Sequence, residues 1–300
     1  MKIFSGSSNR PLAEKIAKKL GLSLSPLEIH SFPDGEKRVR VLDKVLDEDI
    51  ILVQPTSPPV NLNYMELFLI TDALKRSGAS SITLVAPYLG YQRQDHIFRE
   101  GEGVTFSMIA KILETLEIDK IITFDLHTIK IPEFFKIGVL HLSALALFAE
   151  KIREISGQPS VVLVSPDMGG LRRIRMLSEL LGNIPTASVV KNRNLKTGKI
   201  DSSEIQGEVL GKTAIIVDDM ISTGETLEGA ISLIKKQEAL KIYVFATHPV
   251  FSKNATERLK NFPVERFYVT DSVYVPDEKK IDKLEIISIA DLIAKELKKL

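Results

Sequence analysis

Short, nearly continuous apolar runs alternate along the chain with longer segments in which apolar positions repeat every three to four residues. Each run consists largely of β-branched and aliphatic side chains. The clearest runs are residues 50–53, 82–86, 120–124, 161–164, 213–217 and 242–246. Apolar residues at nearly every position are typical of strands that are buried on both faces of a parallel sheet.

The segments between these runs have the periodicity of amphipathic helices. In residues 11–20 the apolar side chains share one face, Asn9 precedes the segment as a candidate cap, and Gly21 is expected to end it. Residues 225–236 and 289–300 have the same pattern. Alternating strands and helices predict an α/β fold of mostly parallel sheets flanked by helices, with ligands at the carboxyl ends of the strands.

The two halves of the chain repeat this order of elements. A strand–loop–helix–strand unit covers residues 50–88, and a second unit with similar spacing covers residues 213–248. We interpret them as parts of two similar domains, residues 1–145 and 146–288. The alternative is that any two strand–helix–strand units resemble each other to this degree.

Composition narrows the class of protein. The 300 residues carry 40 basic and 39 acidic side chains, for a formal net charge of +1, and 44% of them are hydrophobic. These proportions are typical of a folded globular protein. A charge near zero without a long basic block argues against nucleic acid as a partner. The lack of cysteine excludes disulfides, thiol nucleophiles and thiolate-bound metals.

Membrane and export signals are not visible in the sequence. No apolar run approaches the roughly 20 residues of a membrane-spanning helix. The richest stretch, residues 139–149, is interrupted by His141 and Ser143. The first residues turn polar soon after Phe4, which does not fit a signal peptide. We therefore expect a cytoplasmic protein without a membrane partner.

The most informative polar segment follows the apolar run at residues 213–217. Two adjacent acids, Asp218 and Asp219, lead into a small hydroxyl-rich loop and a helix that is expected to begin at Glu225. Backbone N–H groups at a helix start can cradle phosphate, and Gly224 allows close approach of the backbone. Two acids beside such a cradle suit sugar hydroxyls or Mg²⁺. The alternative is a capped helix start without a ligand.

Further polar segments stand at turns or after apolar runs. They are Phe32-Pro33-Asp34-Gly35-Glu36, Tyr91-Gln92-Arg93-Gln94-Asp95, Asp125-Leu126-His127, Ser165-Pro166-Asp167-Met168-Gly169-Gly170 and Lys191-Asn192-Arg193. Taken singly, each has a plainer interpretation, such as a hairpin turn, a structural histidine or a solvated loop. Arg and Gln side chains can also fork onto phosphate oxygens, and Asp167 is a possible oxygen ligand for Mg²⁺.

Together with Val217-Asp218-Asp219, these segments occur in the order and spacing of one family. The chain resembles the ribose-phosphate pyrophosphokinases (phosphoribosyl pyrophosphate synthetases) along essentially its whole length. The resemblance implies two domains of phosphoribosyltransferase-like type, with the helix at residues 289–300 returning to the first. It also implies transfer of the pyrophosphoryl group of Mg-ATP to the 1-hydroxyl of ribose 5-phosphate. The products would be AMP and 5-phospho-α-D-ribose 1-diphosphate (PRPP), for nucleotide biosynthesis.

The resemblance also implies a role for each motif. The residues implied to bind ATP are Phe32, Asp34, Gly35, Glu36, Arg93, Gln94 and His127. Those implied to bind ribose 5-phosphate are Arg193, Asp218, Asp219, Ser222, Thr223, Gly224, Glu225 and Thr226. His127 and Asp167 would hold Mg²⁺, and Lys191 and Arg193 would be the catalytic residues. Because residues 34–36 reach the adenine of a neighbouring subunit in that family, at least a dimer is implied.

The chain departs from the commonest family pattern in three places, and two alternative functions remain. Thr128 stands where Ala or Ser is frequent, Asn192 where Arg is frequent, and Ser222 where Asp is frequent. One alternative is a non-catalytic relative that regulates a synthetase, although such relatives typically lose the catalytic motifs. The other is a phosphoribosyltransferase, which explains residues 218–226 but not residues 34–36.

Overall fold

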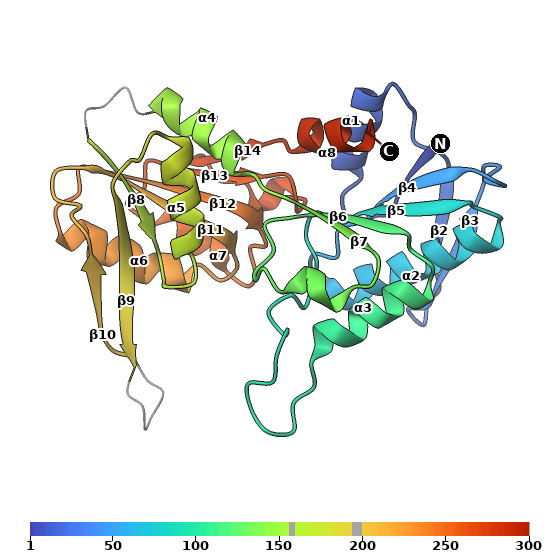
Figure 1. Ribbon diagram of the computed structural model, residues 1–300, viewed down its shortest axis with the longest axis horizontal. Coiled ribbons are helices and arrows are strands. Elements are labelled where there is room, and N and C mark those ends of the chain that lie inside the picture. Colours follow the sequence, from blue (N-terminus) through green and yellow to red (C-terminus); the bar gives the residue numbers. More distant parts are fainter. Residues whose placement is uncertain (156–159, 194–199, 300) are drawn as a thin grey trace. The chain divides into compact units, whose positions relative to one another are not determined.

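The computed structural model describes residues 1–155, 160–193 and 200–299, and for residues 191–193 and 200–202 it describes the backbone alone (Figure 1). The chain divides into two compact units. The first consists of Met1–Leu142, Ser272–Tyr274 and Ser288–Leu300, and the second of Ser143–Asp271 and Val275–Ile287.

The first unit is built on a five-stranded, all-parallel sheet with the strand order β1-β4-β5-β6-β7. The strands are β1 (Lys2–Ser5), β4 (Asp49–Val53), β5 (Ser81–Val85), β6 (Lys120–Phe124) and β7 (Gly138–Leu142). A separate antiparallel pair consists of β2 (Leu27–Ser31) and β3 (Lys37–Val41). The helices are α1 (Arg10–Leu20), α2 (Val60–Arg76), α3 (Thr105–Thr115), the short 3-10 helix η1 (Ile131–Phe134) and α8 (Ala290–Leu297).

Helices cover both faces of this sheet. Apolar side chains of α2 and α3 form one core cluster with alternate residues of the strands, while α1 and α8 lie against each other on the opposite face (Figure 1). The predicted start and end of α1 are confirmed. The Asn9 side chain accepts a hydrogen bond from the backbone N–H of Leu12 at 3.3 Å, and Gly21 ends the helix with φ of +72°.

The second unit contains a seven-stranded sheet with the order β10-β9-β8-β11-β12-β13-β14, in which only β10 is antiparallel to its neighbour. The strands are β8 (Val161–Ser165), β9 (Thr186–Arg193), β10 (Ile200–Gln206), β11 (Thr213–Ile221), β12 (Lys241–Pro249), β13 (Arg266–Thr270) and β14 (Leu284–Ile287). The helices are α4 (Leu145–Ile155), α5 (Leu171–Leu180), α6 (Glu225–Lys236), α7 (Ala255–Lys260) and the short η2 (Asp277–Lys279).

The second sheet is also buried on both faces, as the continuous apolar runs predicted. Ala214 and Ile216 of β11 pack into one cluster with α6 and α7. Ile215 and Val217, which point to the other face, pack into a second cluster with α4 and α5. The alternation follows from the two-residue period of a strand. The sequence prediction of an α/β fold with two parallel sheets is therefore confirmed.

The structure corrects the predicted end of β11. We expected a strand over residues 213–217, but β11 continues to Ile221 because its pairing with β12 extends to the pair Ile221–Pro249. Its pairing with β8 on the other side ends at the pair Ile216–Val164. Asp218 and Asp219 therefore lie inside β11, at a level where one neighbouring strand has already ended.

Within residues 1–155, 160–193 and 200–299, no helix is both long and apolar enough to cross a bilayer.

Replacing Phe245 in the centre of β12 tests the packing of the second unit. This ring is fully buried and contacts the rings of Phe148 and Tyr268, with centroids 5.3 and 4.6 Å away. We expect Phe245→Ala to lower the free energy of unfolding by about 3–5 kcal/mol, because the truncation leaves a cavity. Urea unfolding followed by circular dichroism measures this change. Leu240→Ala, at a side chain that is 67% exposed, is the control; an equal effect of both variants would contradict the packing.

Candidate functional site

Two carboxylates and one guanidinium meet at the carboxyl end of β11. Arg173 of α5 lies 3.4 Å from Asp218 and 3.8 Å from Asp219, measured from guanidinium nitrogen to carboxylate oxygen. The Asp218 side chain is 14% exposed. Burial and the adjacent Asp219 carboxylate raise the pKa of Asp218 well above its usual value, and Arg173 opposes this only in part.

Asp167 stands at the same edge of the sheet, just after β8. Its Oδ1 accepts the backbone N–H of Gly170 at 3.2 Å, and the Ser165 hydroxyl donates to its backbone carbonyl at 2.6 Å. A Cβ at Gly170 would lie 2.4 Å from the Ser165 hydroxyl oxygen, so this tight turn requires glycine. The charge of Asp167 also contributes to the raised pKa of Asp218, so two neighbouring carboxylates act on this one.

The loop before α6 presents backbone donors at the same end of β11. Gly224 takes φ of +82° and is the N-cap of α6, and the Thr223 hydroxyl accepts the N–H of Glu225 at 3.5 Å. The first N–H groups of a helix have no intrahelical acceptor and attract anions. Ser222 and Thr223 add hydroxyls, and the Ser222 hydroxyl lies 3.3 Å from that of Ser252.

An acid in the first turn of α6 is held by a partner on α7. Arg258 lies 3.7 Å from the Glu225 carboxylate and 3.1 Å from that of Glu228. These contacts offset negative charge close to the helix start, where it would oppose an incoming anion. Thr226 follows Glu225 and is half-buried.

Arg173 is a site residue that the sequence motifs missed. It lies in the first turn of α5, where the helix dipole disfavours a cation and where no acidic residue is found. A basic first turn directly after the Asp167 loop was therefore a signal that an anionic partner lies nearby. The partner itself is 45 positions away along the chain.

In the first unit, side chains join the loops after β5 and β6. Gln92, which is buried, accepts the backbone N–H of His127 with its Oε1 at 2.9 Å. The Thr128 hydroxyl donates to Asp95 at 2.9 Å. These two hydrogen bonds bring the loop that carries Arg93 and Gln94 together with the loop that carries His127. In this chain the Thr128 hydroxyl thus joins the two loops through its hydrogen bond to Asp95.

A small hollow opens at the first of these loops. Its volume is about 200 Å³, and exposed Arg93 and Gln94 line it together with four less exposed residues: Val60, Tyr88, Tyr91 and Gln92. The Gln94 Oε1 accepts the Thr105 hydroxyl at the start of α3 at 2.7 Å. The predicted ATP residues of this loop are accordingly exposed beside a concave surface.

The predicted turn at residues 32–36 forms the tip of the β2–β3 pair. The Phe32 N–H donates to the Glu36 carbonyl at 2.8 Å, and Gly35 takes φ of +93°. Asp34 and Glu36 are exposed, and the Phe32 ring is 37% exposed, with the Arg38 guanidinium 5.9 Å from its centroid. An exposed aromatic ring in the same turn as two acids leaves a flat surface for another planar group.

Lys191 and Arg193 lie at the end of β9, whose backbone pairs with β10. Their side chains, and residues 194–199, lie outside the described part of the structure.

His127 and Asp167, the predicted Mg²⁺ ligands, belong to different units. Among the residues whose side chains are described, no group of three or more His, Asp or Glu residues encloses a metal position. The type of donor nevertheless suits a hard cation, since carboxylate oxygens are the ligands that Mg²⁺ prefers. A divalent cation would also reduce the repulsion between the negative charges around Asp218.

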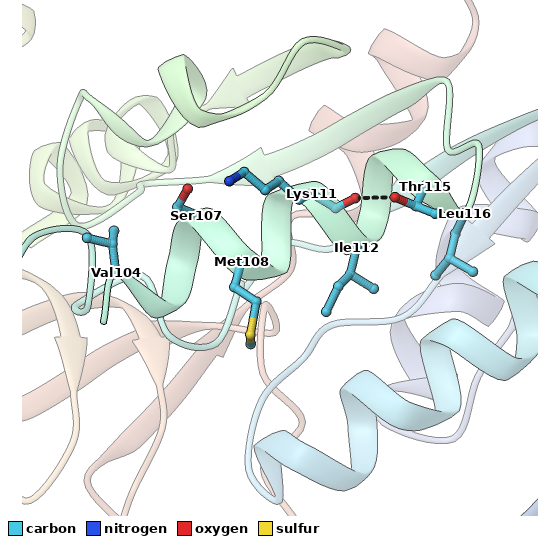
Figure 2. Close-up of a pocket in the computed structure, with 7 residues that line it drawn as sticks. All are labelled: Val104, Ser107, Met108, Lys111, Ile112, Thr115 and Leu116. Carbon is cyan, nitrogen blue, oxygen red and sulfur yellow. Dashed lines mark hydrogen bonds between the residues drawn. The ribbon is translucent and has the colours of Figure 1, made fainter. Parts of the chain in front are cut away.

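A larger hollow of about 560 Å³ runs along the outer side of α3 and contains no predicted site residue (Figure 2). The picture shows one charged side chain, Lys111, beside mostly aliphatic groups. The lining residues are Val104, Ser107, Met108, Lys111, Ile112, Thr115 and Leu116.

Comparisons with known proteins cover both units. The N-terminal domain of ribose phosphate pyrophosphokinase matches residues 1–116, and the phosphoribosyl synthetase-associated domain matches residues 185–300. The ribose-phosphate pyrophosphokinase of Fusobacterium nucleatum is 40% identical over 295 residues, with 98% of this chain and 93% of the relative covered. Ribose-phosphate pyrophosphokinase 2 of Enterococcus faecalis is 40% identical over 302 residues, with 100% and 93% covered. A crystal structure of phosphoribosylpyrophosphate synthetase from Mycobacterium smegmatis has a TM-score of 0.92 at 33% identity, covering 99% of this chain and 97% of that one.

Removing the charge of Asp218 tests the electrostatics of the β11 edge. Because its pKa is raised in the folded state, the fold loses stability as pH rises from about 4, the ordinary aspartate value, through the raised value. We expect ligand-free Asp218→Asn to melt about 2–4 °C above the parent at pH 8, for a gain on the order of 1 kcal/mol. At pH 4, where the parent carboxyl is protonated, the gain should vanish.

Differential scanning calorimetry at both pH values measures the two melting temperatures. Asp282→Asn, at an exposed carboxylate of the same unit, is the matched control. A lower melting temperature for Asp218→Asn at pH 8 would show that Arg173 outweighs the repulsion.

Proposed function

The chain belongs to the ribose-phosphate pyrophosphokinase family, and from this membership we propose how its residues divide the reaction. It is a ribose-phosphate diphosphokinase, a transferase that makes PRPP for nucleotide biosynthesis. The observation that carries the assignment of the sugar site is the edge of β11, where Asp218 and Asp219 run into the donor-rich start of α6. A phosphoribosyltransferase explains that edge but not the match of residues 1–116 to the pyrophosphokinase domain.

Ribose 5-phosphate is proposed to bind at this edge. Residues 222–226 hold the 5-phosphate through backbone N–H groups and hydroxyls, as anions bind at helix starts. Asp218 and Asp219 accept hydrogen bonds from the ribose hydroxyls, and Arg173 keeps both carboxylates in place at 3.4 and 3.8 Å. The loop thus offers hydrogen-bond donors to the phosphate oxygens, and the two carboxylates offer acceptors to the ribose hydroxyls.

ATP is proposed to bind through Arg93, Gln94 and His127 of the first unit. The two hydrogen bonds between their loops support a shared role in holding the nucleotide and its phosphates. The adenine contacts come from Phe32 and from residues 34–36 of a second copy of the chain, since this turn is exposed at the tip of its own strand pair. The active form is accordingly at least a dimer. ATP is supplied in the cytoplasm, which we propose as its setting.

His127 and Asp167 are proposed to hold Mg²⁺ with the triphosphate of ATP. An imidazole nitrogen and a carboxylate oxygen are acceptable ligands, and the crowded carboxylates near Asp167 favour a cation there. When bound, the ion neutralises triphosphate charge that would repel the attacking oxygen.

The reaction is proposed as an in-line transfer. The 1-hydroxyl of ribose 5-phosphate attacks the β-phosphorus of ATP, the bond to the α-phosphate oxygen breaks, and AMP leaves. Such transfers depend on positioning and charge stabilisation more than on covalent catalysis. Asp218 and Asp219 orient the sugar, and Arg93 and Gln94 hold the phosphates. Lys191 and Arg193 stabilise the charge that develops on the leaving and transferred oxygens.

The activity is tested by incubating the protein with ATP, MgCl₂ and ribose 5-phosphate and separating the nucleotides by chromatography. We expect AMP and PRPP in equal amounts, and no AMP when the sugar phosphate is omitted. Formation of ADP would instead indicate transfer of one phosphoryl group and would contradict the proposed attack on the β-phosphorus.

The role of Lys191 is tested by Lys191→Ala. Loss of a cation that acts in the transition state should lower kcat by about 10²–10³, with smaller changes in KM for either substrate. Steady-state kinetics with each substrate varied in turn gives these constants. Lys236→Ala, in the last turn of α6 and away from the helix start, is the control. Near-normal kcat in Lys191→Ala would remove this residue from the transition state.

A further inference from the structure

A fully buried carboxylate, Glu66 of α2, stands outside the proposed catalytic groups and joins four segments of the first unit. Its oxygens accept the backbone N–H of Ser7 at 2.6 Å, the Ser7 hydroxyl at 2.8 Å and the Gln54 amide at 3.1 Å. A fourth hydrogen bond comes from the ammonium group of Lys37. A buried charge is tolerated when it is paired and hydrogen-bonded in this way.

Lys37 brings β3 into this network. It is the first residue of β3 and, by the alternation of a strand, shares a face with Val39 and Val41, which pack against the core of the first unit. Arg38 and Arg40 face the other way and are exposed. The inner face of β3 thus carries two valines and then a cation whose side chain is only 18% exposed.

The ion pair lies directly beside the exposed turn at residues 32–36. Glu36, the last residue of the exposed turn at residues 32–36, is bonded directly to Lys37. The β2–β3 pair has only two strands, and such a pair is marginal without packing against another element. Its valine contacts lie toward the other end of β3, so Lys37 is the inward-facing contact nearest the tip.

Burial of an ion pair contributes little net stability compared with apolar residues of the same volume, but it specifies one arrangement. Slippage of β3 by one residue would turn Lys37 outward and leave the Glu66 carboxylate without its cation. Glu66 is itself fixed by Ser7 and Gln54, so the partner that Lys37 must meet cannot follow a displaced strand.

We propose that Lys37 and Glu66 are positioning residues for ATP: their ion pair holds the turn at residues 32–36 in the position from which it contacts the nucleotide. Neither residue touches the substrate. The inference rests on the proposed function, because that function places the adenine against this turn. Under this inference, affinity for ATP depends on the buried ion pair between Lys37 of β3 and Glu66 of α2.

The test compares four variants: Lys37→Met, Glu66→Gln, the double variant, and Arg40→Met. Methionine keeps the length and apolar stem of lysine, and glutamine keeps an acceptor for Ser7. Arg40→Met removes a cation from the outward face of the same strand and is the matched control. We expect Lys37→Met and Glu66→Gln each to raise KM for ATP about tenfold, with KM for ribose 5-phosphate and kcat changed less than about twofold.

The double variant shows whether the two substitutions affect KM for ATP through the same ion pair or independently of each other. If the two residues act only through each other, the double variant should raise KM for ATP no more than the worse single variant. Arg40→Met should leave every constant unchanged. Direct titration of ATP by calorimetry with the same proteins should show the same order of affinities.

Two results would overturn the inference. One is an unchanged KM and Kd for ATP in Lys37→Met and in the double variant, since the double variant leaves no buried charge unpaired and should fold. The other is a lower melting temperature with reduced kcat and both KM values unchanged, which indicates a structural role alone. Failure of the proposed function looks different, because the parent protein then forms no PRPP. The calorimetric comparison still tests the pair in that case.

Discussion

Burial of both faces of each parallel sheet is the constraint on which the rest of the structure depends. Along β11, Ile215 packs with one pair of helices and Ile216 with the other, so neither face has room for charge. In β11 the two charged side chains, Asp218 and Asp219, therefore come only after these buried residues. At the carboxyl ends, loops and helix starts add donors that the strands cannot supply, and the candidate site residues of both units stand there, except for the turn at residues 32–36.

The charges gathered at one of these ends are not balanced within the unit. Asp167 and Asp219 both act on Asp218, and Arg173 compensates only part of their repulsion. Such an arrangement costs free energy in the unliganded protein and is typical of binding and catalytic sites. A ligand that brings hydroxyl donors or a cation removes that cost, so the same carboxylates that disfavour the empty site favour the occupied one.

The sequence predicted the parts of the fold that depend on local signals. Apolar runs identified the buried strands, and a cap and a glycine identified α1, whereas the end of β11 was placed too early because Asp218 interrupts its apolar pattern. Lys37 and Glu66 were not identified, because each looks like an ordinary surface charge until the fold brings its partner close, and Arg173 was missed although its place in the first turn of α5 was a signal. Lys37 and Glu66 are 29 positions apart. The roles of Lys191 and of the other motif residues stay predictions from the family.

The return of α8 to the first unit has a consequence for the order in which the units can fold. The residues of the second unit end at Ile287, and the helix that covers part of the first sheet, with Lys19 paired to Asp291 at 2.7 Å, comes after them. During synthesis, the ribosome therefore releases the whole second unit before the first has its last helix. The domain that begins first is finished last, and until then the apolar surface of α1 that α8 covers is open to chaperones and to other nascent chains.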